Sequence, residues 1–412
     1  MHPNALLLAC CALLSAPLCA APNVRTVPDQ WPTIQSAIDA SAAGDIVLVA
    51  HGDYRECLRL RGRALTLASL AGPENTYVHA SGGCTVLTID LGEGRDTMIE
   101  GFTLRGGQDR LHAGGVHIEG AAPTLRANVI EENAGGPLGH GISLVDSPGA
   151  VLQDNEVRFN RSLPGAHGAG GGGGIGVHRG ADVQIVGNRI GANQTSLSSG
   201  GGLLLVDVGA IRIHGNHIGG NRARLAGGGI AVLGRSQPRI EQNLIVGNSV
   251  AEPGTGGGVH WLIAPGGRGP ALVGNTLVNN QAQRGAGLYA DGDDGATVVA
   301  NNLILAVQGD SAVECGDFYD GQPPSLRNNN IVGGRAGLCT GRPGAGDGNL
   351  AAMPAFQPGT WRLASGSPGI DAGAASFASA KTDFDGAPRQ RDGDGDGSEA
   401  IDIGAFESDG PR

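Results

Sequence analysis

An asparagine returns in the same local setting roughly once every 28 residues through most of this chain. Its eight positions are Asn128, Asn155, Asn188, Asn216, Asn243, Asn275, Asn302 and Asn329. Three residues before each stands an aliphatic residue: Leu125, Leu152, Ile185, Ile213, Ile240, Leu272, Val299 and Leu326. Two residues after each stands another: Ile130, Val157, Ile190, Ile218, Ile245, Leu277, Ile304 and Ile331. Self-similarity at such a period predicts a stacked solenoid.

The repeat unit is built from strands. It has no apolar stripe at helical spacing, whereas residues 141–145 and 211–214 alternate between the two faces of a strand. Glycine precedes an apolar residue once per unit, as in Gly174-Ile175 and Gly229-Ile230. Five residues after the first six asparagines comes a second one: Asn133, Asn160, Asn193, Asn221, Asn248 and Asn280. The pattern predicts an all-β, parallel β-helix with aliphatic columns inside and asparagines stacked at a turn, hydrogen-bonded from coil to coil.

The length of the repeat region sets the domain organisation. Residues 46–350 give about ten to eleven coils at this period. Residues 22–45 are expected to form an N-terminal cap, because 32–40 have helical apolar spacing and the exposed edges of a solenoid need a cover. The repeat fades after about residue 340, so 351–412 are expected to form an irregular C-terminal cap. Glycine is abundant, 74 of 412 residues, but it lacks the three-residue period of collagen.

The N-terminal residues 1–21 are predicted to be a signal peptide. Residues 5–18 are mostly apolar, and the small residues Cys19, Ala20 and Ala21 follow. A membrane anchor is the alternative, although the apolar stretch is short for one. Later segments do not reach 18 consecutive apolar residues, so the mature chain is expected to have no membrane span. We expect a monomer that is secreted or associated with the cell surface.

Export permits disulfides, and four cysteines remain after the signal peptide. Cys315 and Cys339 stand 24 residues apart, and Cys57 and Cys84 stand 27 apart, close to one coil in each case. Residues one coil apart are neighbours along the stack, within reach of a disulfide. We therefore predict the pairs Cys315–Cys339 and Cys57–Cys84. The chain has no C-x-x-C pair, which disfavours zinc.

The formal charge of −11 disfavours nucleic acid and anionic membrane surfaces as partners. Extracellular polysaccharide or a surface glycan is the expected partner. The outward strand positions His117, His260 and Tyr289 are candidates for a shallow glycan-binding face. Ordinary exposed positions are the competing interpretation.

Two stretches at the ends of the chain resemble a known family. Residues 32–40 (PTIQSAIDA) and 44–56 (GDIVLVAHGDYRE) look like the opening of bacterial secreted right-handed β-helix proteins of the pectin-lyase-like superfamily. The tail resembles the choice-of-anchor Q type of that group, at 362–373 (RLASGSPGIDAG), 383–389 (DFDGAPR) and 401–407 (IDIGAFE). The resemblance implies a right-handed β-helix, and it is nearly silent on activity.

The superfamily also contains polysaccharide lyases and galacturonan hydrolases. The string from Gly139 to Leu144 resembles the His-Gly element of polygalacturonases, with His140 in the histidine position. Hydrolysis needs an acid and a base flanking the bond. At the matching strand positions, no two carboxylates follow each other in adjacent coils. We therefore expect a structural, adhesive or glycan-binding role without an identifiable catalytic site. A lyase or glycoside hydrolase acting on acidic polysaccharide is the alternative.

One acidic motif in the tail is a candidate calcium loop. Asp392, Asp394 and Asp396 alternate with glycines, which allows several carboxylate oxygens to face one hard cation. The loop is not an EF-hand, because the twelfth position lacks the required glutamate. Glu399 or Asp402 could complete the ligand shell. We expect a structural Ca²⁺ here, against the alternative of a solvated acidic turn.

Overall fold

The computed structural model describes residues 21–164, 171–196, 198–292, 295, 297–306, 311–319, 322–340, 347–378 and 380–410. The predicted signal peptide therefore lies almost wholly outside the described residues. Among the described residues, no helix is long and apolar enough to cross a membrane.

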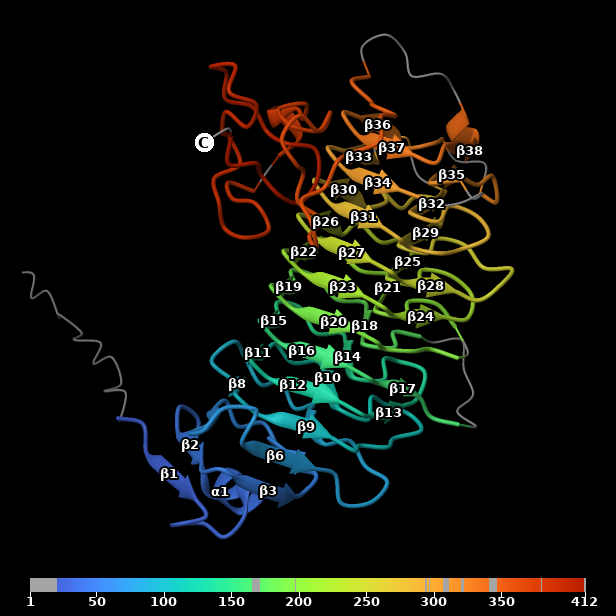
Figure 1. Ribbon diagram of the computed structural model, residues 1–412. Helices are drawn as coiled ribbons and strands as arrows, with labels where there is room; N and C mark the ends of the chain where they lie inside the picture. Colours follow the sequence, from blue (N-terminus) through green and yellow to red (C-terminus); the bar gives the residue numbers. More distant parts are fainter. Residues whose placement is uncertain are drawn as a thin grey trace, which may run out of the picture.

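Three parallel sheets run the length of the molecule, and each coil contributes one strand to each sheet (Figure 1). Sheet A comprises β1 (Val24–Val27), β2 (Ile46–Val49), β5 (Thr66–Ser69), β8 (Met98–Glu100), β11 (Thr124–Arg126), β15 (Val151–Gln153), β19 (Gln184–Val186), β22 (Arg212–His214), β26 (Arg239–Glu241), β30 (Ala271–Val273), β33 (Val298–Ala300) and β36 (Ser325–Arg327). Sheet B comprises β3 (Gly52–Arg55), β6 (Thr76–His79), β9 (Thr103–Arg105), β12 (Val129–Glu131), β16 (Glu156–Arg158), β20 (Arg189–Gly191), β23 (His217–Gly219), β27 (Leu244–Val246), β31 (Thr276–Val278), β34 (Leu303–Leu305) and β37 (Asn330–Val332). Sheet C comprises β4 (Leu58–Arg59), β7 (Leu87–Ile89), β10 (Val116–Glu119), β14 (Ile142–Val145), β18 (Ile175–His178), β21 (Leu203–Val206), β25 (Ile230–Gly234), β29 (Val259–Ile263), β32 (Leu288–Asp291), β35 (Val313–Cys315) and β38 (Arg335–Gly337).

The remaining elements are short. The pairs β13 (Ala134–Gly135) with β17 (Arg161–Ser162) and β24 (Arg222–Ala223) with β28 (Ser249–Val250) form two small parallel sheets. Two 3₁₀ turns, η1 (Leu338–Thr340) and η2 (Ala375–Phe377), follow the strands. Each coil passes through sheets C, A and B, in that chain order.

The aliphatic columns predicted from the repeat form the core. In sheet A, Leu152 pairs with Ile185 and Ile185 with Ile213, so that equivalent residues stack directly. The residues three before and two after each asparagine are buried in every coil but the last. In the last coil Leu326 is only half-buried, because its strand β36 is the edge strand of sheet A. The parallel β-helix prediction is confirmed.

The asparagines stack where sheet A turns into sheet B. The side-chain amide of Asn188 donates to Oδ1 of Asn216 at 3.0 Å, and Asn216 donates in the same way to Asn243. Each amide also donates to a strand carbonyl of the preceding coil, as Asn216 does to Ile185 at 2.8 Å. Gly187 and Gly215 precede two of these asparagines with φ of 67° and 63°, which is the left-handed conformation that turns the chain.

A short helix covers the first coil. α1 (Ile34–Ala40) begins with a capping box from Thr33, and its residues Ile34, Ala37 and Ile38 are fully buried. The Glu56 carboxylate accepts the first free N–H groups of the helix, those of Ile34 and Gln35. The strand β1, ahead of α1, already belongs to sheet A, which the repeat pattern did not indicate.

The C-terminal segment lies beside the last coils (Figure 1). Apolar residues on the outer face of sheet B, including Leu244 and Leu303, pack against Phe406 and Ile403 from the tail. The Thr276 hydroxyl accepts the N–H of Ala405 at 3.0 Å. The outer face of sheet B changes from charged to apolar at these coils, so the tail buries a face that water would otherwise contact.

Candidate functional site

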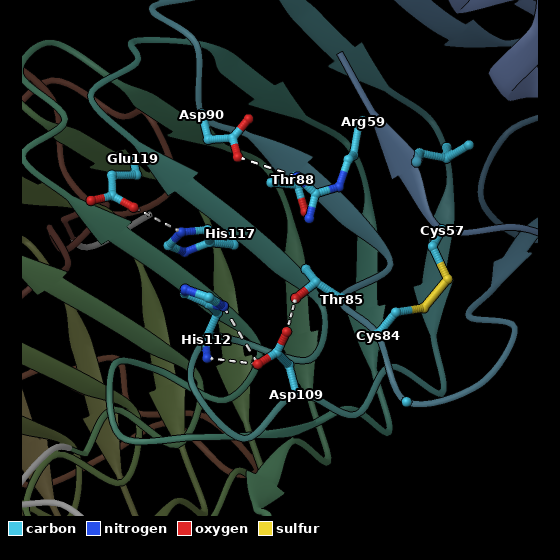
Figure 2. A pocket seen from close by; sticks show the side chains of 12 residues that line it. Cys57, Arg59, Cys84, Thr85, Thr88, Asp90, Asp109, His112, His117 and Glu119 are labelled. Carbon is cyan, nitrogen blue, oxygen red and sulfur yellow. Dashed lines mark hydrogen bonds and ion pairs between the residues drawn. A yellow bond between two sulfur atoms is a disulfide. The ribbon is translucent and has the colours of Figure 1, made fainter. Parts of the chain in front are cut away.

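The two predicted disulfides are present. Cys57 and Cys84 are bonded with a Cα–Cα distance of 6.5 Å, and Cys315 and Cys339 with one of 5.1 Å. One pair joins the first coils and the other joins the last. The Cys57–Cys84 bond also lies in the wall of the pocket described below (Figure 2).

Glycine-rich segments cover the outer face of sheet C over the central coils. A Cβ atom on Gly200 would lie 2.8 Å from the Cβ of Leu204, and one on Gly256 would lie 2.5 Å from the Cβ of His260. These segments can therefore lie on the sheet only because they lack side chains. This close contact explains why glycine precedes each strand in the repeat.

The first coils are open instead. A Cβ atom on Gly83, before β7, would approach only the carbonyl of Gln108, at 3.9 Å. A pocket of about 290 Å³ forms here over β4, β7 and β10 (Figure 2). We call it the sheet C pocket. Its lining residues are Cys57, Leu58, Arg59, Gly83, Cys84, Thr85, Thr88, Asp90, Asp109, His112, His117 and Glu119.

Strand alternation aims the polar residues into the pocket. Arg59, Thr88 and His117 form one row across the three strands, directly paired in the parallel register. Their neighbours Leu58, Leu87 and Val116 face the core and are at most 1% exposed. The row could have been found from sequence, since its members are spaced 88 − 59 = 29 and 117 − 88 = 29 residues apart. Sequence reasoning selected only His117 from it.

The loop between β9 and β10 forms the opposite wall with Asp109 and His112. The Asp109 carboxylate accepts the N–H groups of Leu111 and His112 at 2.8 and 3.0 Å, and the Thr85 hydroxyl at 3.2 Å. Burial opposes ionisation of Asp109, but these backbone N–H groups prevail and its pKa is lowered. Asp109 is thus a fixed negative charge in the pocket wall.

Two imidazole rings lie together in the pocket. The ring centroids of His112 and His117 are 4.2 Å apart. His117 Nδ1 is 2.8 Å from the Ser143 hydroxyl, and its Nε2 is 3.4 Å from the Glu119 carboxylate. His112 Nδ1 is 3.4 Å from Asp109. Burial, and secondly the neighbouring His112, lower the pKa of His117, so this ring is neutral near pH 7.

The other histidines proposed from sequence lie elsewhere. His260 and Tyr289 stack in adjacent strands of sheet C with centroids 5.2 Å apart, and they are only 6% and 7% exposed. His260 is five strands along from His117, about 24 Å at one strand spacing per coil. His117, His260 and Tyr289 lie in one outward row of sheet C, as expected. They are buried, however, and His117 is far from the other two, so they do not form one exposed binding face. His140 is buried between the Gly136 carbonyl and the Ser162 hydroxyl, and burial lowers its pKa to about 4.

In the acidic tail loop, the structure brings Asp392 and Asp394 together with Asp371. One carboxylate oxygen from each lies within 4.8 Å of the others. Among the described residues this is the one group of three acidic, histidine or cysteine side chains with that spacing. Asp371 Oδ1 is buried without a hydrogen-bond partner, which fits a cation ligand. Sequence reasoning missed Asp371 because it stands 21 residues before Asp392.

The other three proposed ligands are placed differently. Asp396 and Glu399 are exposed and lie outside the group of three. Asp402 is 1% exposed, and its carboxylate accepts the N–H groups of Asp371 and Ser408. Asp402 therefore holds the backbone of Asp371 in place and does not belong to the group of three carboxylates.

A buried charge cluster lies below this loop. The Arg389 guanidinium and the Glu407 carboxyl group lie 2.7 Å apart, and both residues are 3% exposed. Asp402 and Asp383 are buried beside them. Burial, with help from these two carboxylates, raises the pKa of Glu407 to about 9 in spite of Arg389.

Comparisons with known proteins address the fold. Residues 114–304 match the family model described as the right handed beta helix region. No curated protein matches the chain. Three solved structures are similar at low identity. The Dettilon tailspike protein is 13% identical with a TM-score of 0.44, over 77% of this chain and 59% of the tailspike chain. The chain thus spans about three fifths of that protein.

The other two solved structures are also similar at low sequence identity. Pectate lyase Pel9A is 13% identical with a TM-score of 0.43, over 91% of both chains. The A-module of the mannuronan C-5 epimerase AlgE4 of Azotobacter vinelandii is 17% identical with a TM-score of 0.37, over 79% of this chain and 93% of the module. Together with the three parallel sheets, the family match over the central coils shows that this chain has the right-handed parallel β-helix fold.

Proposed function

We propose that this chain is an extracellular protein that binds a glycan in the sheet C pocket. The observation that carries the proposal is the pocket itself, where strands of sheet C and the loop between β9 and β10 place hydrogen-bonding side chains around one volume of about 290 Å³. Carboxylates accept hydrogen bonds from sugar hydroxyls, while the Thr88 hydroxyl and imidazole nitrogens can donate or accept. The His112 side chain is 38% exposed, so its ring can contact the apolar face of a sugar.

Two features support an extracellular location. Both disulfides are of the kind that persist in oxidising compartments. The apolar N-terminal stretch is of the kind that directs export. A rigid rod of stacked coils also suits a structural or adhesive role at a surface, with the pocket at one end of the rod.

A binding experiment tests the proposal. The full chain is applied to a glycan array, and the affinity for the best ligand is then measured by calorimetry. His112→Ala is expected to weaken binding roughly tenfold, because it removes one of the two rings and the partner of Asp109. His51→Ala is the matched control, since His51 is exposed and outside the pocket. The proposal would be refuted if His112→Ala and His51→Ala bound the ligand with equal affinity, or if no glycan on the array bound the protein.

Glycan cleavage is a second candidate function. The favouring observation is that His112 and His117 each lie 3.4 Å from a carboxylate in one pocket, and histidine is the side chain most often used for acid–base catalysis. Polysaccharides that bind are incubated with the protein, and new reducing ends and unsaturated products are measured. Product formation that is lost in His112→Ala but kept in His51→Ala would support an enzyme. Binding without any product would leave the chain a glycan-binding protein.

A further inference from the structure

The charge of the sheet C pocket opposes an acidic ligand. Three carboxylates line it, from Asp90, Asp109 and Glu119, against one guanidinium from Arg59. Arg59 lies 3.5 Å from Asp90 and so offsets that carboxylate first. Counting these carboxylates and the guanidinium, the lining carries 1 − 3 = −2 charges.

The arrangement of the carboxylates indicates what kind of cation would fit. They do not form a three-ligand group of the kind that the tail loop shows within the described residues, so they are not assembled around a small metal ion. They stand around the wall of a 290 Å³ pocket instead, which is near the lower limit for a site that holds one small organic group. An ammonium group has three donors and no acceptor, and it complements carboxylates, which only accept.

We infer that the pocket selects a positively charged amino sugar, such as a glucosamine unit with a free amine, over neutral sugars and over uronates. This inference rests on the proposed glycan binding and adds the class of sugar. It reverses the expectation of an acidic polysaccharide. The amine is placed among the pocket carboxylates, while the ring hydroxyls contact Thr88 and the histidines.

Glu119 is the residue best suited to test the inference. Its side chain is 54% exposed, so replacement with Gln is compatible with folding, and its neighbour His117 is neutral and does not offset its charge. Asp109 is less suitable, because it also holds the loop through three hydrogen bonds. Glu100→Gln is a matched control. It removes the same charge from a partly exposed glutamate that pairs with Arg126 on sheet A.

The experiment measures affinities of the full chain for four probes: a glucosamine tetramer, the same tetramer N-acetylated, a galacturonate tetramer and tetralysine. The affinity is expected to be highest for the glucosamine tetramer, lower for the N-acetylated tetramer and lowest for the galacturonate tetramer. Glu119→Gln should lower the glucosamine affinity about twofold to fivefold at low ionic strength and leave the N-acetylated tetramer unchanged. Added salt should reduce the same preference. Glu100→Gln should have no effect on either sugar.

The outcomes separate this inference from the proposed function. Galacturonate that binds as well as glucosamine overturns the inference, while glycan binding itself stands. An equal loss in Glu100→Gln and Glu119→Gln also overturns it, because the preference would then arise from the net charge of the molecule. Tetralysine binding as tight as glucosamine would show selection of cations without recognition of a sugar and would overturn it as well. Failure of every sugar to bind would refute the proposed function, and the inference with it.

Discussion

Asn216 shows how much one side chain contributes to the stack. Its amide donates to Ile185 and Asn243, and its Oδ1 accepts both the backbone and side-chain N–H groups of Asn188. Asn216→Ala should lower the free energy of unfolding by at least about 2 kcal/mol, because several buried polar groups lose their partner. Urea unfolding measures the loss. Asn75→Ala is the control, because the exposed Asn75 side chain donates one hydrogen bond, to the Ala71 carbonyl. A similar loss in both variants would contradict the prediction.

At the same scale, the sequence predicted the positions of residues that recur in every repeat because each must fill the same structural position. The columns around Asn188 and Asn216 were predictable because a core position and a hydrogen-bonding turn position each admit few residue types. Arg59 and Thr88 of the pocket were missed, because they belong to the first coils, where the asparagine motif that marks the register is absent. The burial of His260 was missed as well, because it depends on a glycine segment folding back over the sheet. Alternation along a strand shows that a side chain points outward, but it does not show whether another segment covers that side chain.

Among the elements, the acidic loop of the tail carries the calcium proposal. Ca²⁺ should raise the melting temperature of the tail by mass action, equivalent to about 2.7 kcal/mol at a hundredfold excess over Kd. Asp394→Asn should abolish the gain, because Asp394 belongs to the group with Asp371 and Asp392. Asp396→Asn, outside that group, should keep most of it. Calorimetry with Ca²⁺ and with chelator provides the measurement, and identical curves in all samples would leave only a solvated turn.

The tail and the N-terminal cap should respond to pH in opposite directions. The pKa of Glu407 is raised from 4.5 to about 9, so its contribution to stability is complete below pH 4.5 and is lost as pH rises toward 9. Asp45, beside α1, has a pKa lowered from 3.8 to about 2, chiefly by the N–H of Ala42, so its contribution is lost as pH falls from about 4 to 2. Hydrogen exchange across this range should show the tail opening in alkali and the N-terminal cap opening in acid. Glu407→Gln should flatten the alkaline limb; an unchanged limb would contradict the assignment.

For the whole molecule, stability is expected to be local to neighbouring coils. The two disulfides lie near opposite ends of the rod, so their reduction should loosen the ends and leave the centre protected. Hydrogen exchange in strands β4, β7, β35 and β38 should rise on reduction, while β19 and β22 should exchange as before. Simultaneous loss of protection in all strands would indicate a single cooperative unit instead.

The stacked asparagines also bear on how such a chain can change its length. Removal of residues 189–216, one step of 28 residues, joins Asn188 to His217. The run Arg189-Ile190-Gly191-Ala192-Asn193 is then replaced by His217-Ile218-Gly219-Gly220-Asn221, which keeps both asparagines and the core isoleucine in register. Every hydrogen bond that Asn188 made to Asn216 can be made to Asn243. Whole coils are thus interchangeable modules, and gene duplication or deletion in units of one period can move the pocket nearer to or farther from the tail without redesigning either.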